Sequence, residues 1–147
     1  MFREKWVQSQ QDFQDAALIR DEVFVKEQGF ENELDDIDAV AHHVVFYDEA
    51  GTPLATGRAF PAQEQEDGIY KIGRVCVRRC ARGTGAGRAV MEALERKIKS
   101  LGGCEAQLGA QIRAKEFYKH LGYQEFGEPF LDEGCPHIMM KNLLYSK

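Results

Sequence analysis

Apolar residues recur at helical spacing in three stretches of the chain, and polar or glycine residues mark the ends of each stretch. Before the first stretch, Ser9-Gln10-Gln11-Asp12 has the form of a capping box, and the pattern ends at about Gln28, before Gly29. The second stretch ends at Gly102-Gly103 and the third at Gly122. The apolar positions that define these three expected helices are Phe13, Ala16, Ala17, Ile19, Val23 and Phe24; Val90, Leu94, Ile98 and Leu101; and Ala114, Phe117, Tyr118 and Leu121.

Strand-like runs fill most of the chain between the expected helices. The turn residues of 48–53 predict a hairpin between two of these runs, and a polar loop at 63–68 precedes the next one. The order of strands and helices predicts an α/β (α+β) fold with a mixed sheet, in which the second helix makes one parallel β-α-β crossover. The expected strands cover residues 4–8, 42–47, 54–60, 70–77, 105–110, 123–126 and 137–144.

Composition narrows the class of protein. With 147 residues, of which 44% are hydrophobic and 29% charged, the chain is expected to fold as one globular domain over residues 1–147. The formal net charge of −5 argues against a nucleic-acid-binding surface. The four cysteines lack the spacing of a zinc site, and no apolar run approaches the ~20 residues of a membrane span. We therefore expect a soluble, cytoplasmic protein without a metal, a nucleic-acid partner or a membrane anchor, and the formation of a homodimer stays open.

The segment 31–38 is strongly acidic, because it holds five carboxylates and few apolar residues. A solvated loop or a short helix is the expected structure, and a role in facing the substrate is the alternative. In the second case its charge favours a cationic substrate such as a polyamine.

Three alternating glycines connect an expected strand to an expected helix in the stretch Arg82-Gly83-Thr84-Gly85-Ala86-Gly87-Arg88. Glycine allows a positive φ and lets a ligand come close to the main chain. The first turn of the following helix offers amide groups without an internal partner, and the helix dipole favours negative charge there. The stretch therefore predicts a phosphate-binding loop, with a glycine-rich turn that binds nothing as the alternative.

Two familiar phosphate loops do not fit the spacing of these glycines. A Walker loop requires a Lys-Ser/Thr pair after its last glycine, and no such pair follows. A dinucleotide fingerprint requires a third glycine at a position where Arg88 or Val90 stands. Arg82 and Arg88 flank the stretch and could reach phosphate oxygens.

A second motif lies downstream, where residues Gln111 to Tyr123 have the pattern Gln-x-x-Ala-x-x-x-Tyr-x-x-x-Gly-Tyr. Together, the two motifs resemble the GNAT superfamily of N-acetyltransferases, whose glycine loop reads Gln/Arg-x-x-Gly-x-Gly/Ala. The second family motif has Asn where this chain has Gln111 and Phe where it has Tyr123. Segments 20–28 and 133–140 resemble the ElaA/YjcF-like branch of the superfamily.

The resemblance implies a mostly antiparallel central sheet that splays to form a cleft for acetyl-CoA. The pyrophosphate of coenzyme A would rest on the amides of residues 82–88. The pantetheine arm would pair with the backbone of residues 75–77, where one amide would polarise the thioester carbonyl. The residues that the resemblance assigns to the cofactor are Val75, Cys76, Val77, Arg82, Gly83, Thr84, Gly85, Ala86, Gly87, Arg88, Gln111 and Tyr118.

The same resemblance implies direct attack of a primary amine, from a small molecule or a peptide, on acetyl-CoA in a ternary complex. Tyr118 matches the family tyrosine and is the candidate acid for the departing thiolate, with a core aromatic as the alternative. Glu27 and His137 are the candidate bases, with a solvated helix-end carboxylate and a strand histidine as the alternatives. Of His42 and His43, at most one can face the cleft, because neighbours on a strand face opposite ways.

Other functions stay open at the level of the sequence. A non-catalytic acyl-CoA-binding or regulatory protein would keep the glycine stretch without turnover, and a structural domain would carry it empty. Cys76 is expected to be a small apolar strand residue rather than a nucleophile, because the sequence places no histidine or carboxylate beside it.

Overall fold

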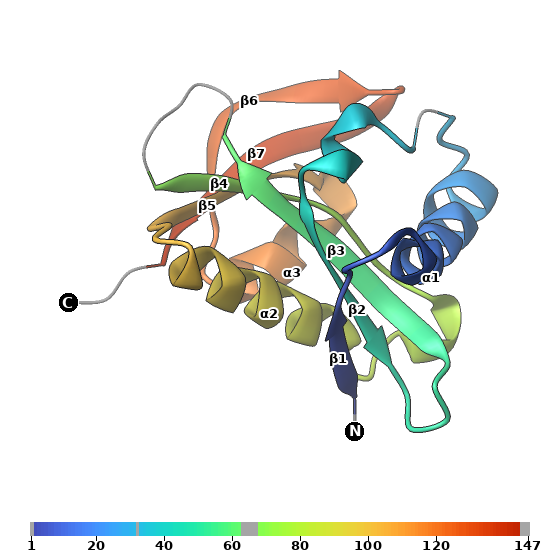
Figure 1. Cartoon of the computed structure of the whole chain (residues 1–147). Coiled ribbons are helices and arrows are strands. Elements are labelled where there is room, and N and C mark those ends of the chain that lie inside the picture. Colours follow the sequence, from blue (N-terminus) through green and yellow to red (C-terminus); the bar gives the residue numbers. More distant parts are fainter. Residues whose placement is uncertain (1, 32, 63–67, 145–147) are drawn as a thin grey trace.

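The computed structural model describes residues 2–31, 33–62 and 68–144. Its strands form a seven-stranded sheet in the order β1-β2-β3-β4-β5-β7-β6, with helices on both faces (Figure 1). Neighbouring strands are antiparallel except β4 and β5, which run parallel. The strands are β1 (Arg3–Trp6), β2 (His42–Tyr47), β3 (Pro53–Pro61), β4 (Ile69–Val77), β5 (Glu105–Gln111), β6 (Gln124–Asp132) and β7 (Cys135–Leu143).

The predicted order of helices and strands is confirmed, and α2 (Ala86–Ser100) makes the parallel crossover from β4 to β5. The other α-helices of the described residues are α1 (Gln10–Arg20) and α3 (Lys115–His120). The mixed, mostly antiparallel α/β fold that the sequence predicts is therefore correct. The shorter helical segments are η1 (Asp21–Glu27), η2 (Asp36–Ala39), η3 (Arg79–Ala81) and η4 (Ile112–Ala114).

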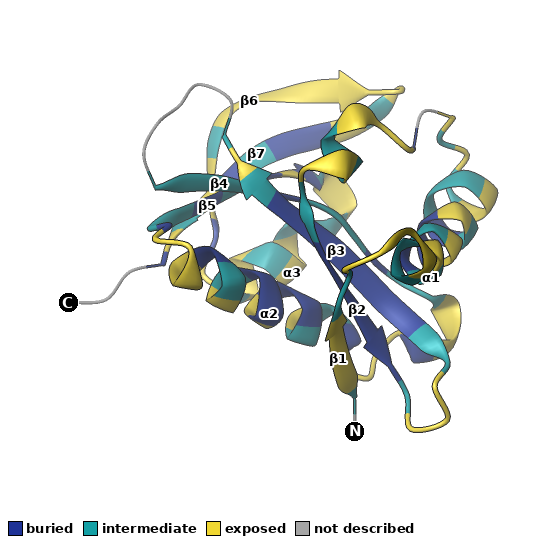
Figure 2. Ribbon diagram, viewed as in Figure 1, coloured by how far each residue is buried: buried dark blue, intermediate teal, exposed yellow. Residues whose placement is uncertain are grey.

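The sheet separates two apolar cores, each covered by helices. On one face, α2 buries Val90, Leu94 and Ile98 completely. Because these residues recur every four positions, they lie on one side of the helix, and Figure 2 shows that the buried side of α2 faces the strands. On the opposite face, Ala16 and Ile19 of α1 belong to a smaller core.

A glycine in β3 brings α2 close to the sheet. A Cβ atom on Gly57 would lie 2.8 Å from Val90 Cγ1 and 2.9 Å from Leu94 Cδ1. Packed carbon atoms are normally about 3.5–4.0 Å apart, so no larger residue fits without a shift of the helix. The first turns of α2, which follow the glycine stretch, are thus held against the sheet.

The first helix changes its hydrogen bonding after Arg20. The chain stays helical to Glu27, close to the predicted end at Gln28, but its last seven residues form the π-helix η1. Such wide turns are frequent near functional sites. In η1, Val23 is buried in the smaller core while Glu27 lies near the glycine stretch.

A bulge interrupts β4 at Arg74. In the register with β3, Gly73 faces Arg58 and Cys76 faces Thr56, so two residues of β4 lie opposite one of β3. Arg74 has a φ of 52°, a left-handed conformation that is rare for residues other than glycine. The bulge reverses the alternation of side chains along the second half of β4.

β4 and β5 pair only where they begin. Their parallel register joins Ile69–Lys71 to Glu105–Gln107. Beyond this point β4 continues to Val77 on β3, whereas β5 continues to Gln111 on β7. The two strands therefore diverge, and the edge of β4 that faces β5 has no further strand partner among the described residues. This opening is the splayed cleft expected from the resemblance.

The last two strands are longer than predicted. β6 extends to Asp132 rather than 126, and a register shift between Phe126 and Phe130 interrupts its pairing with β7. Gly127, within that shift, has a φ of 75°. Of the polar loop predicted at 63–68, residues 63–67 lie outside the described residues. No helix in the described part of the chain is long and apolar enough to cross a membrane.

Candidate active site

A cleft of about 1490 Å³ opens between the diverging ends of β4 and β5. Its walls come from the glycine stretch, η1 and the ends of β5 and β7. Every candidate site residue from the sequence lines this cleft except Thr84. The lining candidates are Glu27, Val75, Cys76, Val77, Arg82, Gly83, Gly85, Ala86, Gly87, Arg88, Gln111, Tyr118 and His137.

Two glycines give the stretch its open backbone. Gly83 and Gly85 have φ values of 79° and 89°, which glycine adopts without steric cost. A Cβ atom on either residue would have no atom within 4 Å, so this side of the main chain is accessible. Gly85 caps α2, and no side chain caps the first turn of that helix. The free amides and the helix dipole together favour an anion here.

Gly87 and Thr84 serve packing and loop structure instead. A Cβ atom on Gly87 would lie 3.3 Å from Phe117 Cζ and 3.5 Å from Val77 Cγ2, so a larger residue would crowd α3 and β4. The Thr84 hydroxyl donates a hydrogen bond to the carbonyl of Ala81 and thereby holds the turn. The three glycines are therefore required for two different reasons.

Glu27 pairs with the arginine at the start of the glycine stretch. Its carboxylate accepts hydrogen bonds from Arg82 Nη1 and Nη2, both at 2.7 Å, and lies 3.3 Å from Arg79 Nη2. The hydrogen bonds from Arg82, followed by those from Arg79, lower the pKa of Glu27 from 4.5 to about 2. A carboxylate with so low a pKa is a weak proton acceptor at neutral pH. Its contacts fit a role in holding Arg82.

Tyr118 and Cys76 lie close together at the centre of the cleft. The Tyr118 ring is half-buried between Phe117 and Tyr123, with centroid distances of 5.0 and 6.1 Å. Its hydroxyl has no hydrogen bond within the described residues, and burial, then the nearby Cys76 thiol, raise its pKa. Burial also raises the pKa of Cys76, which is 6% exposed. The thiol therefore stays protonated, as fits a small apolar strand residue.

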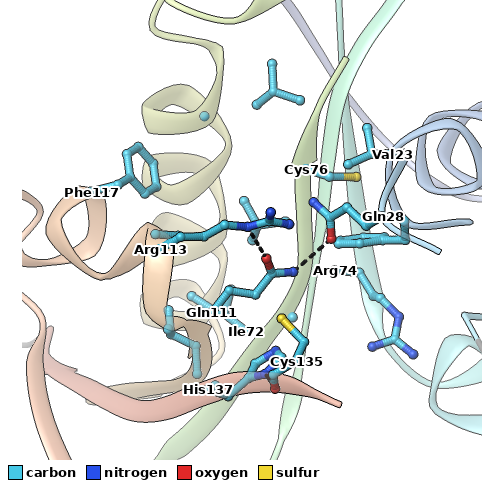
Figure 3. Close-up of a pocket in the computed structure, with 18 of the residues that line it drawn as sticks. Val23, Gln28, Ile72, Arg74, Cys76, Gln111, Arg113, Phe117, Cys135 and His137 are labelled. Atoms are coloured by element: carbon cyan, nitrogen blue, oxygen red, sulfur yellow. Dashed lines mark hydrogen bonds between the residues drawn. The ribbon is translucent and has the colours of Figure 1, made fainter. Parts of the chain in front are cut away.

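Gln111 links both sides of the cleft. Its Nε2 donates to Gln28 Oε1 at 2.9 Å, and its Oε1 accepts from Arg113 Nε at 2.8 Å (Figure 3). The first bond joins the end of β5 to the residue after η1, and the second joins it to η4. The sequence motif singled out Gln111, whereas the contribution of Arg113 depends on the turn into η4 and has no sequence signal.

His137 of β7 lies on the cleft wall opposite β4 (Figure 3). It is 7% exposed, and its ring stacks on Phe130 of β6 with a centroid distance of 5.5 Å. Nδ1 lies 2.8 Å from the carbonyl oxygen of Cys135. A nitrogen at this distance from a carbonyl donates its proton, so the neutral ring keeps a lone pair on Nε2. Phe130 escaped the sequence reasoning because the predicted strand stopped before it.

The acidic segment contains the short helix η2, one of the two structures that the sequence predicted, but not all of its carboxylates are solvated. Glu33 is 7% exposed, and its carboxylate accepts a hydrogen bond from Arg20, which is 1% exposed. Asp38 accepts from Arg20 Nη1 at 2.8 Å and from Arg58 Nη1 at 2.7 Å. The solvated environment was wrong for Glu33 and Asp38, because arginines from α1 and β3 bind these two carboxylates inside the protein.

This arginine–carboxylate network reaches the cleft through Arg74. Asp35 accepts from Arg58 at 2.6 and 3.0 Å and from Arg74 Nη2 at 3.3 Å. Arg74 Nε also donates to the backbone carbonyl of Glu33 at 2.9 Å. The members of the network are Arg20, Arg58 and Arg74 with Glu33, Asp35 and Asp38, so its cations and carboxylates are equal in number.

Neither histidine of the His42-His43 pair lines the cleft. His43 is 4% exposed, and its Nε2 lies 3.0 Å from the carbonyl oxygen of Asp38. Burial lowers the pKa of His43, so the neutral ring donates this hydrogen bond. Burial lowers the pKa of His42 as well, on the opposite face of β2. His43 thus helps to hold the acidic segment in place.

The chain is similar to known proteins over almost its whole length. Residues 9–144 match a family model described as "Acetyltransferase (GNAT) domain". The uncharacterized N-acetyltransferase YjcF of Bacillus subtilis is 38% identical over 135 residues, which cover 90% of this chain and 93% of that protein. An acyl-CoA N-acyltransferase from Pseudomonas aeruginosa has a TM-score of 0.84 at 26% identity, covering 97% and 99% of the two chains. Escherichia coli ElaA shares the fold, with a TM-score of 0.85 at 23% identity and the same coverage.

Proposed function

Because the chain belongs to the acetyltransferase (GNAT) family, in its ElaA/YjcF-like branch, we propose that it moves an acetyl group from acetyl-CoA to a primary amine. Acyl transfer from an acyl-CoA to an amine is the activity to which this family points; the acetyl donor and an acceptor that is a small molecule or peptide are the proposal. The observation that carries it is one cleft in which the open glycine stretch meets the unpaired edge of β4. A phosphate site and a strand edge are what a pyrophosphate with a pantetheine arm requires.

The glycine stretch is the proposed site of the pyrophosphate. The amides of residues 82–88 would bind its oxygens, since Gly83 and Gly85 leave that side of the backbone open. Arg88 lies in the first turn of α2 and pairs only with the exposed Glu92, at 3.1 Å among the described residues, so it can turn toward phosphate. Arg82 would contribute its positive charge from the position that Glu27 gives it.

The unpaired edge of β4 is the proposed site of the pantetheine arm. Residues 75–77 would add the arm to the sheet through backbone hydrogen bonds, in the manner of an added strand. One of their amides would point at the thioester carbonyl and stabilise the negative charge that develops on its oxygen. The bulge at Arg74 fixes which amides face the opening, because it shifts the alternation of β4 just before these residues.

Tyr118 is the proposed acid. Its raised pKa keeps the phenol protonated at neutral pH, and its hydroxyl has no partner among the described residues, so the proton is available for the departing thiolate. The neighbouring Cys76 is neutral for the same reason of burial, which fits direct attack of the amine in a ternary complex without an acyl-enzyme.

His137 is the better of the two proposed bases. An amine attacks only after it has lost its proton, which requires an acceptor on the cleft wall or a water chain leading to one. The Nδ1 contact with the Cys135 carbonyl leaves Nε2 of His137 ready to accept that proton. Glu27 is held by two arginines and has a pKa of about 2, so we assign it to positioning Arg82.

Thiol release from acetyl-CoA in the presence of a panel of primary amines tests the function. The wild-type protein is expected to release the thiol with at least one amine, and Tyr118→Phe to lower this turnover by about 10²–10⁴ with little change in acetyl-CoA binding. Tyr47→Phe is the matched control, since Tyr47 bonds Asp15 away from the cleft. Binding of acetyl-CoA without release for any amine would favour a non-catalytic acyl-CoA-binding protein.

A further inference from the structure

The part of the cleft away from the glycine stretch, where the acceptor amine would bind, is called the acceptor end. Beside it, one half of a sheet face is open. α1 packs on β2, β3 and β4, where Val45, Tyr47 and Cys76 belong to its core. By the strand register, the same face continues across the first residues of β4 and on to β5 and β7, beyond the strands on which α1 packs. Phe60 and Met139 lie on this open half and line the cleft.

Lys71 is the lysine of that open half that lines the cleft, whereas Lys141, on the same face through Gln107, is exposed and does not line it. It lies opposite Phe60 of β3 and Gln107 of β5, and cross-strand neighbours share a face of the sheet. Its side chain is half-buried in the wall of the cleft, and it makes no ion pair or hydrogen bond with the described residues. The nearby carboxylate of Glu105 accepts a hydrogen bond from Gln107 Nε2 at 2.7 Å rather than from Lys71. An ammonium group without a partner in a cleft wall can take a negative group of a ligand.

The carboxylates closest to α1 do not offer a site for a cation. Each carboxylate of the arginine–carboxylate network binds at least one arginine. Asp132, the last residue of β6, and Glu133, in the turn that follows, also line the cleft, but they lie beyond His137 and away from Gln107. Glu31 and Asp36, the other two carboxylates of the acidic segment, do not line the cleft, so the segment gives no support to the polyamine acceptor that the sequence suggested.

We propose that the acceptor amine carries a carboxylate, which pairs with the Lys71 ammonium, while its apolar body lies over Phe60 and Met139. This inference rests on the proposed N-acetyltransferase function. Lys71 and Val75 are four residues apart, at most about 13 Å along β4, because the bulge at Arg74 shortens the strand between them. The lysine side chain spans part of that distance, so the amine and carboxylate of the acceptor are several bonds apart, as in an ω-amino acid or a short peptide.

Two acceptors of equal length test the pairing. 6-Aminohexanoate has the carboxylate, and 6-aminohexanamide replaces it with a neutral amide. The wild-type protein is expected to prefer the acid by about fivefold in kcat/KM, the value of one partly exposed ion pair. In Lys71→Met the preference falls to about one, through a higher KM for the acid alone. Lys141→Met is the control, because Lys141 lies over Phe126 outside the cleft and the preference should persist.

The outcomes separate this inference from the proposed function. A wild-type protein that acetylates both amines equally, or a Lys71→Met variant that keeps the preference, overturns the role of Lys71 and leaves the acetyltransferase in place. If no amine releases thiol, the proposed function fails. Calorimetry with coenzyme A present then decides the inference by binding alone: weaker binding of 6-aminohexanoate to Lys71→Met supports it, and equal binding overturns it.

Discussion

The two ends of the cleft present charge in opposite ways. At the glycine-stretch end, positive potential comes from backbone amides of a few consecutive residues, and the backbone beside Gly83 and Gly85 is open. At the acceptor end, the charges of the arginine–carboxylate network belong to side chains from α1, the acidic segment and the sheet, and they neutralise one another. The first arrangement leaves its charge available to a ligand, whereas the second uses its charge to hold the protein together.

The largest effect is expected where the open backbone is blocked. Gly85→Glu places a carboxylate at the proposed pyrophosphate site and should abolish the rise in Tm that acetyl-CoA produces. At 100 times Kd that stabilisation amounts to about 2.7 kcal/mol for a bound ligand. Differential scanning fluorimetry with and without acetyl-CoA measures the loss.

Gly127→Glu is the matched control for this experiment. Gly127 has a φ of 75° and, like Gly85, no atom within 4 Å of an added Cβ, but it lies in the irregular part of β6. Backbone strain should lower the Tm of both variants without ligand. Only Gly85→Glu should lose the shift, and a shift that survives in it would remove the glycine stretch from cofactor binding.

The contrast between local backbone charge at one end of the cleft and paired side-chain charge at the other also explains how much of each end could be predicted from the sequence. Three glycines within five residues determine the glycine stretch locally, because φ and the free amides depend on consecutive residues. The acceptor end depends on the fold: Arg20 and Glu33 meet only because the chain turns back after η1. A segment with five carboxylates indicates a solvated loop unless its distant arginine partners are known.

The bulge at Arg74 sets a second limit on prediction from sequence. Strict alternation along β4 would place Cys76 on the same face as Ile72, yet Ile72 belongs to the core under α2 and Cys76 to the core under α1. Arg74 carries no local signal for a left-handed φ, unlike a glycine. The order of strands and helices was predictable because apolar spacing is local, whereas the side facing the acceptor depended on this bulge.

A second experiment contrasts the two candidate bases, one from each end of the cleft. His137→Gln should lower kcat by about 10² or more, because the amide keeps the hydrogen bond to the Cys135 carbonyl but cannot accept the proton. Glu27→Gln should instead raise the KM for acetyl-CoA a few fold, because Arg82 loses a charged partner. Steady-state kinetics, with the concentrations of acetyl-CoA and amine varied separately, distinguishes a change in kcat from a change in the KM for acetyl-CoA. A fall in kcat for Glu27→Gln alone would reverse the assignment.

The smallest effect concerns stability at the acceptor end. Burial alone would raise the pKa of Asp38, but hydrogen bonds and charge from Arg20, with Arg58, lower it from 3.8 to about 2. Because the folded pKa is below the unfolded one, its ionisation stabilises the fold above pH 4 and loses this effect as the pH falls toward 2. The contribution at neutral pH is about 2 kcal/mol, from a shift of nearly two pKa units.

Urea unfolding of Asp38→Asn and Glu92→Gln at several pH values compares the network with a surface pair. Asp38→Asn should lose stability at pH 7 and approach the wild-type protein as the pH falls from 4 to 2. Glu92 pairs with Arg88 on the exposed side of α2, so Glu92→Gln should cost no more than about 0.5 kcal/mol at any pH. Equal losses for the two variants would mean that the buried network stabilises the fold no more than a surface pair. The paired charges would then not stabilise the structure of the acceptor end, and the contrast with the open glycine stretch would not hold.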